Sequence, residues 1–210
     1  MIDIVPILST IVCNNMLNLF VRSRTLRQLL SLFFSRPSDK FYLREIARLT
    51  GEPLGAVQRQ LAALEKGGML GSQRVGPLKY YSLRQDYPYR EELQSLVAKE
   101  SRRVLLEKNL RSIMRVLKEK YHPDKVILFG SYAGGKISPE SDLDLLIIKE
   151  NVPKRYWDRI KEIAPLLMGS EVGIDYTVWT PVEWKKGAQE NQFMRQEILS
   201  KGKMLYDKTA

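Results

Sequence analysis

An apolar run that opens with two aspartates is the feature that most constrains the fold of this sequence. Asp142 and Asp144 begin the run, and every residue from Leu145 to Ile148 is apolar. Side chains two apart on a strand point to the same face, so a strand here would place both carboxylates side by side. Because the residues beyond the acids are apolar on both faces, the run predicts a central strand of a sheet. Two adjacent carboxylates repel each other unless a cation lies between them, which predicts a divalent metal.

A glycine-serine turn, Gly130-Ser131, lies upstream, and ten residues separate it from Asp142. The turn follows a short apolar strand and leads into a brief helix, where backbone N–H groups can hold a phosphate. A later predicted strand carries a third acid, Asp175. Together these residues predict a metal-dependent enzyme that handles a nucleoside triphosphate.

Several classes of site and of targeting segment are disfavoured by composition. A single cysteine, Cys13, excludes an intramolecular disulfide and fits a reducing cytoplasm. A single histidine, His122, argues against a histidine-based metal site or a Ser-His catalytic pair. The first twenty residues are apolar, but they lack a basic start and contain Asp3 and Pro6, so they predict neither a signal peptide nor a membrane span. We expect a cytoplasmic protein with no membrane partner.

The positive charge is concentrated in the first part of the chain. Residues 1–120 hold 21 Lys and Arg against 11 Asp and Glu, whereas residues 121–210 hold 13 of each. The net charge of +10 therefore falls entirely in the first part. This asymmetry predicts two modules and a polyanion partner for the first of them. A solvated basic surface without such a partner is the alternative.

The first module is predicted to contain three helices followed by a hairpin. The predicted helices cover 25–34, 42–49 and 54–66, and the predicted strands cover 69–75 and 79–83. Apolar residues recur at helical spacing within each helix, and Gly67-Gly68 ends the third. This order is typical of a winged helix, in which the third helix enters the DNA major groove and the hairpin forms the wing.

Two segments, LREIARLT at 43–50 and VQRQLAALEKGGML at 57–70, resemble the winged helices of small prokaryotic transcription regulators. We interpret residues 23–88 as a winged helix-turn-helix domain that binds double-stranded DNA. The candidate DNA-contacting residues lie on the third helix and beside the wing: Gln58, Arg59, Gln60, Arg74 and Lys79. Two winged helices usually recognise two half-sites, which predicts a homodimer. The alternative is a module that serves only dimerisation or protein contacts.

The remaining segments complete the predicted organisation. Residues 1–22 are interpreted as an N-terminal arm or helix, within which Met16 is an alternative start. Residues 89–120 predict one long linker helix, because apolar residues form a repeating stripe along it. The stripe consists of Leu93, Leu96, Val97, Val104, Leu105, Leu110, Ile113, Met114 and Leu117. Residues 121–208 form the second module, in which predicted strands and helices alternate.

The second module resembles the nucleotidyltransferase domains of the DNA polymerase β-like superfamily in their minimal prokaryotic form. The shared pattern is Gly-Ser, ten residues, Asp-x-Asp on a strand and an acid on a later strand; here these are Gly130-Ser131, Asp142-x-Asp144 and Asp175. The resemblance implies an α+β fold with a mixed sheet, and two Mg²⁺ ions held by the three acids, which would also be the catalytic residues. It further implies ATP as the donor, with Gly130 and Ser131 at its phosphates.

One position departs from the family pattern. The turn usually reads Gly-Ser-x-Ala-Arg-Gly, but Gly134 stands here in place of the arginine. The loss of that charge is expected to weaken triphosphate binding unless Lys136 replaces it. A lysine point charge is not equivalent to the planar fork of an arginine.

These observations predict a metal-dependent nucleotidyltransferase that transfers AMP from ATP to a hydroxyl of a protein or small-molecule acceptor, coupled to a DNA-binding winged helix. Relatives of this minimal type often act as antitoxins that adenylylate a HEPN-type toxin, so such a protein is a candidate partner. Two alternatives remain. One is a transcription regulator whose transferase-like domain only senses nucleotide, and the other is an antitoxin that acts mainly by occupying its partner protein.

Overall fold

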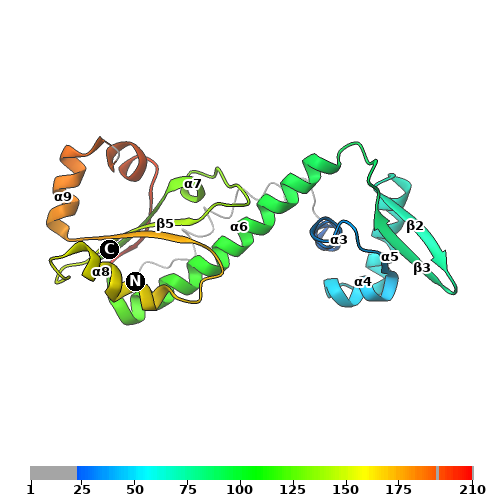
Figure 1. Ribbon diagram of the computed structural model, residues 1–210, viewed down its shortest axis with the longest axis horizontal. Helices are drawn as coiled ribbons and strands as arrows, with labels where there is room; N and C mark the ends of the chain where they lie inside the picture. Colours follow the sequence, from blue (N-terminus) through cyan, green and yellow to red (C-terminus); the bar gives the residue numbers. More distant parts are fainter. Residues whose placement is uncertain (1–22, 193, 210) are drawn as a thin grey trace. The chain divides into compact units, whose positions relative to one another are not determined.

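The computed structural model describes residues 23–192 and 194–209, and these fold into two compact units (Figure 1). Residues 23–101 belong to the first unit, and the described residues from Arg102 onward form the second. The predicted arm at residues 1–22 lies outside the described residues. Within the described part of the chain, no helix combines the length and the apolar character that a membrane span requires.

The first unit consists of three helices and a three-stranded antiparallel sheet. The helices are α3 (Arg24–Ser35), α4 (Leu43–Thr50) and α5 (Leu54–Lys66), and the strands are β1 (Phe41–Tyr42), β2 (Leu70–Val75) and β3 (Leu78–Leu83). β3 lies between the other two strands, and β2 and β3 form a hairpin. Gly51 ends α4 with φ 68°, a left-handed conformation that glycine adopts without a steric penalty. The elements follow the predicted order of three helices and a hairpin.

The core of the first unit fixes which side of α5 remains in solvent. Ile46 on α4 and Leu61 on α5 are fully buried, together with Leu29 on α3. Because one face of α5 is held in this core, Gln58 and Arg59 on the other face are exposed. Two of the three predicted DNA-contacting residues of this helix are therefore accessible, and Gln60 is half-buried.

A long helix, α6 (Arg90–Val116), continues into a π-helical turn, η1 (Leu117–Tyr121). Together the two segments cover nearly all of the helix predicted at 89–120. They contribute to both cores, because Val97 packs in the core of the first unit and Leu110 packs in the core of the second. The N-terminal part of α6 thus packs in the first unit, and the part from Arg102 onward packs in the second.

The predicted apolar stripe of α6 is wrong at one position. The stripe includes Val104, yet this side chain is 54% exposed, whereas Leu106, which the stripe omits, is fully buried. The physical reason is that the two parts of the helix pack in different cores. The buried face therefore does not keep a single helical phase from Val97 to Leu106, and a stripe extrapolated along the whole helix selects the wrong residue.

The second unit is built on a four-stranded mixed sheet. Its strands are β4 (Lys125–Phe129), β5 (Leu143–Ile148), β6 (Ile174–Trp179) and β7 (Lys203–Asp207), in the order β6-β5-β4-β7. β5 is parallel to β6, and β4 is antiparallel to both of its neighbours. The apolar run after the two aspartates is thus an internal strand, as predicted, and β7 is an edge strand. The protein has an α+β fold with a mixed sheet.

Helices cover both faces of this sheet, as Figure 1 shows. The helical segments are α7 (Gly130–Ala133), α8 (Tyr156–Leu167), α9 (Pro181–Glu190) and the π-helical η2 (Met194–Leu199). Leu145 and Ile147 of β5 pack with α6 and α8, whereas Leu146 and Ile148 pack with η2. Since side chains alternate along a strand, Asp144 shares the face of Leu146 and Ile148.

Candidate active site

Strands β5 and β6 bring two of the predicted acids together. Asp144 is the direct register partner of Asp175 in the parallel ladder, so both side chains lie on the same face of the sheet. Asp142 comes two residues earlier, immediately before β5. The pairing of the two strands therefore brings Asp144 and Asp175 side by side, although they are more than thirty positions apart in the sequence.

Two glycines give the acids the space they occupy. A Cβ at Gly130 would overlap the Asp144 carboxylate, and Gly130 also has φ 71°, in the left-handed region. A Cβ at Gly173 would lie 2.5 Å from Oδ1 of Asp142. Gly130 was predicted as a site residue for phosphate approach, whereas Gly173 was not. Its role is apparent only when β6 lies beside β5.

Electrostatics at the paired acids disfavour two full negative charges. The pKa of Asp144 is raised to about 6, first by burial and then by the charges of Asp175 and Asp142. The side chains of Asp144 and Asp175 make no hydrogen bond or ion pair with any other described residue. A cation beside these carboxylates would relieve their repulsion.

The donor set fits a hard divalent cation, although the acids are not gathered into a closed cage. Carboxylate oxygens are the ligands that Mg²⁺ prefers, and those of Asp144 and Asp175 are without protein partners in the described chain. Among residues 23–192 and 194–209, no three Asp, Glu, His or Cys side chains are close enough to hold a metal ion. The joint binding of Mg²⁺ by Asp142, Asp144 and Asp175 stays a prediction.

Ser131 is bound into the loop that leads to Asp142. Its hydroxyl donates to the Oγ of Ser141 over 3.2 Å, and the same Oγ accepts a hydrogen bond from the Ser138 amide at 2.8 Å. Ser141 is buried, so these bonds join the glycine-serine turn to the residue before Asp142. The Ser131 hydroxyl that is predicted to bind a phosphate therefore also stabilises this loop.

Arg102 is a residue of the site that sequence reasoning missed. Its Nε donates to the Ser141 carbonyl at 2.7 Å, and its guanidinium also binds Oδ1 of Asp142 at 3.0 Å. Arg102 lies on α6, 40 residues before Asp142. No local motif connects the two positions, and the predicted linker helix gave no reason to single out one of its arginines.

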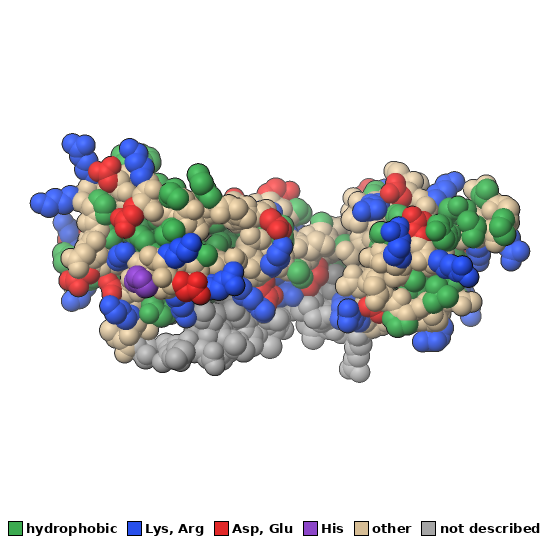
Figure 2. Space-filling model, turned by 90° about the horizontal axis from the view of Figure 1, so that it is seen from below, with side chains coloured by type: hydrophobic (Ala, Val, Ile, Leu, Met, Phe, Trp, Pro, Cys, Tyr) green, Lys and Arg blue, Asp and Glu red, His purple; other side chains and the backbone are tan. Residues whose placement is uncertain are grey.

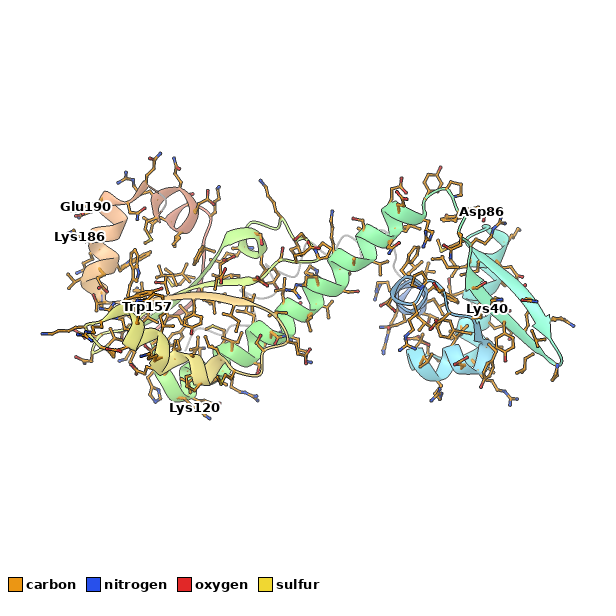
Figure 3. All side chains as sticks on the ribbon, viewed as in Figure 1. Lys40, Asp86, Lys120, Trp157, Lys186 and Glu190 are labelled. Carbon is orange, nitrogen blue, oxygen red and sulfur yellow. The ribbon has the colours of Figure 1, made fainter. Side chains whose placement is uncertain are left out.

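The acid-bearing face of the sheet also carries a cavity of about 640 Å³. Trp179, at the end of β6, lines this cavity together with Lys186 and Glu190 of α9, which are labelled in Figure 3. Trp179 follows Asp175 by four residues on the same strand, so both side chains lie on the same face. None of the three acids lines this open cavity.

The predicted DNA-contacting residues of the first unit differ in their accessibility. Gln58, Arg59 and Arg74 are exposed, and Gln60 is half-buried. The ammonium of Lys79 is already paired with Glu65 at 2.7 Å. Figure 2 shows Lys and Arg side chains spread over the surface of this unit, with fewer acidic ones among them. Arg59 and Arg74 are the better placed of the predicted cations, because neither is paired with another described residue.

Comparison with known protein families matches residues 111–210 to the family described as "Polymerase beta, Nucleotidyltransferase". The match includes the turn at Gly130 and all three acids. It begins within α6, after Arg102.

Three curated relatives come from Methanocaldococcus jannaschii and carry the name "Putative protein adenylyltransferase", as MJ1305, MJ0141 and MJ0604. MJ1305 is 39% identical over 66 residues, which are 30% of this chain and 45% of the relative. MJ0141 is 36% identical over 78 residues, 36% of this chain and 72% of the relative. MJ0604 is 48% identical over 44 residues, 20% of this chain and 44% of the relative. For MJ1305 and MJ0604 the match thus spans less than half of the relative.

A solved structure from Sulfolobus solfataricus, described as a nucleotidyltransferase of inferred function, is 18% identical to this chain. The alignment covers 53% of this chain and 89% of the other, with a TM-score of 0.40. MJ0141 is 36% identical over 72% of its own length, and residues 111–210 match the same kind of domain. Through the segment that holds the glycine-serine turn and the three acids, the chain belongs to the polymerase β-like nucleotidyltransferase family.

Proposed function

We propose that the second unit transfers AMP from ATP to a hydroxyl group and releases pyrophosphate, in a reaction that depends on a divalent metal. The observation that carries this proposal is the register of β5 and β6, which sets Asp144 beside Asp175 without protein partners for either carboxylate. Family membership supports the same reaction type. Nucleotidyl transfer relies on charge neutralisation and in-line positioning more than on covalent chemistry, and the site offers groups for both.

The roles of the acids follow from their placement. Asp144 and Asp175 would hold Mg²⁺ with their carboxylates, and Asp142, just before β5, would contribute its remaining oxygen. Bound Mg²⁺ supplies positive charge that screens the phosphates and makes an acceptor hydroxyl easier to deprotonate. Asp175 stands on the edge strand β6, where an acceptor can approach the site.

The glycine-serine turn would position the donor. Gly130 lets the backbone come close to Asp144, so a phosphate held by the turn would lie beside the acids. Ser131 would add its backbone N–H and its hydroxyl to this phosphate contact. With glycine at position 134, Lys136 is the cation nearest to Ser131 in this loop, and its backbone amide donates to the Ser131 carbonyl at 2.9 Å.

A protein is the acceptor that we favour, since the M. jannaschii relatives are named as protein adenylyltransferases. A HEPN-type partner protein is the specific candidate within that class. The experiment therefore measures AMP transfer to a protein that copurifies with this chain and, separately, to small compounds that carry hydroxyl groups. Transfer to small compounds alone would contradict a protein acceptor.

Labelled ATP tests the transfer itself. ATP carrying its label on the α-phosphate is incubated with the protein, a candidate acceptor and Mg²⁺, and label on the acceptor is measured with and without a chelator. We expect transfer only with Mg²⁺, and a loss of at least about 100-fold in Asp144→Asn, which removes one charge from the site. The matched control is Asp158→Asn, because Asp158 is an exposed acid on α8.

The wild-type protein decides between an enzyme and a sensor. If wild type and the Asp158→Asn control both bind ATP tightly but transfer no label, the result would favour a nucleotide-sensing regulator. The departure from the family pattern at Gly134 favours that alternative. The unpartnered pair of acids favours the enzyme.

We propose, as a second function, that the first unit is a winged helix that binds double-stranded DNA through α5 and the hairpin β2–β3. The supporting observation is the exposed face of α5, with Arg59 free of any described partner, beside a hairpin that carries an exposed Arg74. Basic side chains that neutralise phosphates release counterions, so the affinity should fall as salt rises. A homodimer would allow two such units to contact two half-sites.

A binding titration tests the DNA proposal. Fluorescence anisotropy of a labelled duplex is measured at several salt concentrations for wild type, Arg59→Ala and Arg84→Ala. We expect weaker binding and a smaller salt slope only for Arg59→Ala, because the guanidinium of Arg84 is already paired with Asp86. Equal affinity of all three proteins, or binding that ignores salt, would contradict this proposal.

A further inference from the structure

We propose that Arg102 is a positioning residue of the transferase site, one that holds Asp142 and the loop before it in a single geometry. This inference rests on the proposed transfer reaction. Its structural part, however, is tested by a readout that does not need the enzyme to turn over.

The contacts of Arg102 join two separate groups. One nitrogen binds a backbone carbonyl, that of Ser141, and another binds a carboxylate oxygen of Asp142. A planar guanidinium can make both bonds at once because its donors diverge in fixed directions. The single point charge of a lysine ammonium cannot match this fork.

Burial makes these contacts more than a surface ion pair. The side chain of Arg102 is 18% exposed, whereas that of Asp142 is 44% exposed. An arginine that is largely withdrawn from water and bonded to a buried loop residue, Ser141, loses much of its hydration if those bonds are broken. The pair is therefore expected to persist in solution.

Asp142 is held on two sides. Arg102 binds Oδ1, and the backbone of Gly173 lies close to both oxygens of the carboxylate, since a Cβ there would be 2.5 Å from Oδ1 and 2.8 Å from Oδ2. No described residue donates a hydrogen bond to Oδ2 or forms an ion pair with it, and glycine at position 173 leaves the space beside it open. The arrangement fixes the direction in which Asp142 can offer this oxygen.

The contact network extends from Arg102 to the glycine-serine turn. Ser141 accepts the hydrogen bond of Arg102 on its carbonyl, and its hydroxyl is bonded to the Ser131 hydroxyl and the Ser138 amide. A shift of Arg102 would therefore loosen both the start of β5 and the turn that is proposed to hold the donor. The loop between Ser131 and Asp142 contains no arginine, and the guanidinium that binds it comes from Arg102 on α6.

The competing explanation is that Arg102 contributes only to stability. A merely stabilising residue would lower the melting temperature without loosening the loop in the folded protein and without changing how the site responds to Mg²⁺. The test therefore measures loop dynamics and metal dependence separately from stability.

The experiment compares Arg102→Gln, Arg102→Lys and the control Arg115→Gln with wild type, all as full-length proteins. Arg115 is an exposed arginine of the same helix, and it has no partner among the described residues. Hydrogen–deuterium exchange of residues 136–143 reports on the loop, and circular dichroism confirms that each variant is folded. The rate of label transfer is then measured as a function of Mg²⁺ and of ATP.

We expect exchange in the loop to be about tenfold faster in Arg102→Gln, most clearly at the Ser138 amide, and unchanged in Arg115→Gln. The Mg²⁺ concentration needed for half-maximal transfer should rise, or kcat should fall, by about 10- to 100-fold, with a smaller change in the KM for ATP. Arg102→Lys should fall between wild type and Arg102→Gln in both readouts.

Two results would overturn the proposal. One is loop exchange in Arg102→Gln that equals wild type. The other is a change confined to the KM for ATP, which would make Arg102 a substrate-binding group. If wild type shows no transfer, the proposed reaction fails, but the exchange result still decides whether Arg102 holds the loop.

Discussion

At the scale of single residues, the site depends on two glycines, whose lack of a Cβ makes room for the acids. Gly130 and Gly173 each leave the space that an aspartate carboxylate fills. The two glycines differ in backbone conformation, because Gly130 has a positive φ and Gly173 does not. A substitution at Gly173 therefore tests steric overlap alone.

We expect Gly173→Ala to displace the Asp142 carboxylate and to lower the rate of AMP transfer by at least about tenfold, because the new methyl would lie 2.5 Å from Oδ1. Gly134→Ala is the matched control. A Cβ at Gly134 would meet the Gly130 carbonyl oxygen at 3.5 Å, an ordinary contact, and its φ is −79°. Steady-state transfer assays compare the variants, and equal rates for both would refute the steric argument.

At the scale of elements, α6 shows how packing rather than periodicity selects the buried face. Leu106 is fully buried in the core of the second unit, whereas Val104, two residues earlier, is 54% exposed. Both residues are apolar and lie on the same helix. Only the contacts of the folded chain distinguish them.

We expect Leu106→Ala to lower the free energy of unfolding by about 2–5 kcal/mol, since it leaves a cavity in a packed core. Val104→Ala should change it by less than about 0.5 kcal/mol, because the side chain is mostly in solvent. Urea denaturation followed by circular dichroism measures both. Similar effects of the two substitutions would show that the buried face of α6 is assigned incorrectly.

A buried arginine ties three elements of the second unit together. Arg159 on α8 is 6% exposed, and it donates to the Val178 carbonyl on β6 at 3.1 Å and to Glu183 on α9 at 2.6 Å. Glu183 also accepts a hydrogen bond from the Thr180 amide at 2.7 Å, as part of a capping box that begins α9. The pairing with Arg159, more than any other contact, lowers the pKa of Glu183 to about 2.

We expect the contribution of Glu183 to stability to depend on pH. Its pKa is lower in the folded protein than the ordinary value of 4.5, so the contribution is complete above pH 4.5 and is lost as pH falls toward 2. At pH 7, Glu183→Gln should lower the free energy of unfolding by roughly 1–2 kcal/mol, a modest value because the carboxylate is 45% exposed. The difference from wild type should shrink in urea titrations at lower pH.

The control for this prediction is Glu190→Gln, on the same helix. Glu190 pairs with Lys186 at 3.8 Å, and both side chains are mostly exposed. Such a surface pair contributes between zero and about 1 kcal/mol. A Glu183→Gln effect that is constant from pH 7 to pH 2 would contradict the proposed cause.

At the scale of the whole molecule, two units with separate cores carry the two proposed functions. The core of the first unit orients α5, and the core of the second sets the register of β5 and β6. The predicted first part, residues 1–120, extends past the unit boundary at Arg102, so the excess positive charge is shared by both units: residues 23–101 hold 13 Lys and Arg against 8 Asp and Glu, and residues 102–210 hold 20 against 15. The three acids fall in the second unit, and Arg59 and Arg74 fall in the first. The residues proposed for DNA binding and for transfer thus lie in different units.

We expect the two activities to be separable by single substitutions. Arg59→Ala should weaken duplex binding by about tenfold and leave AMP transfer within about twofold of wild type. Asp144→Asn should have the opposite pattern. Anisotropy and label transfer are measured on the same preparations, and a loss of both activities in either variant would contradict separate sites.

Much of the fold was predictable because the sequence carries local signals for it. Helical apolar patterns located the three helices of the first unit within about a residue, and α5 was predicted at its observed bounds of 54–66, whereas the short strand β1 was not predicted. The acid pair and the glycine-serine turn were found because each is a short motif. Arg102 and Gly173 were not found, because each meets Asp142 only after distant elements pack.

The sequence by itself determined the order of the main helices and strands, the net charge, and the acids available for chemistry, since these depend on residue type and on spacing along the chain. Tertiary structure alone decided that Asp144 pairs with Asp175, that Arg102 binds Asp142, and that Leu106 rather than Val104 is buried. The physical reason is that strand register and helix packing are set by contacts between residues far apart in the chain, which no local pattern encodes.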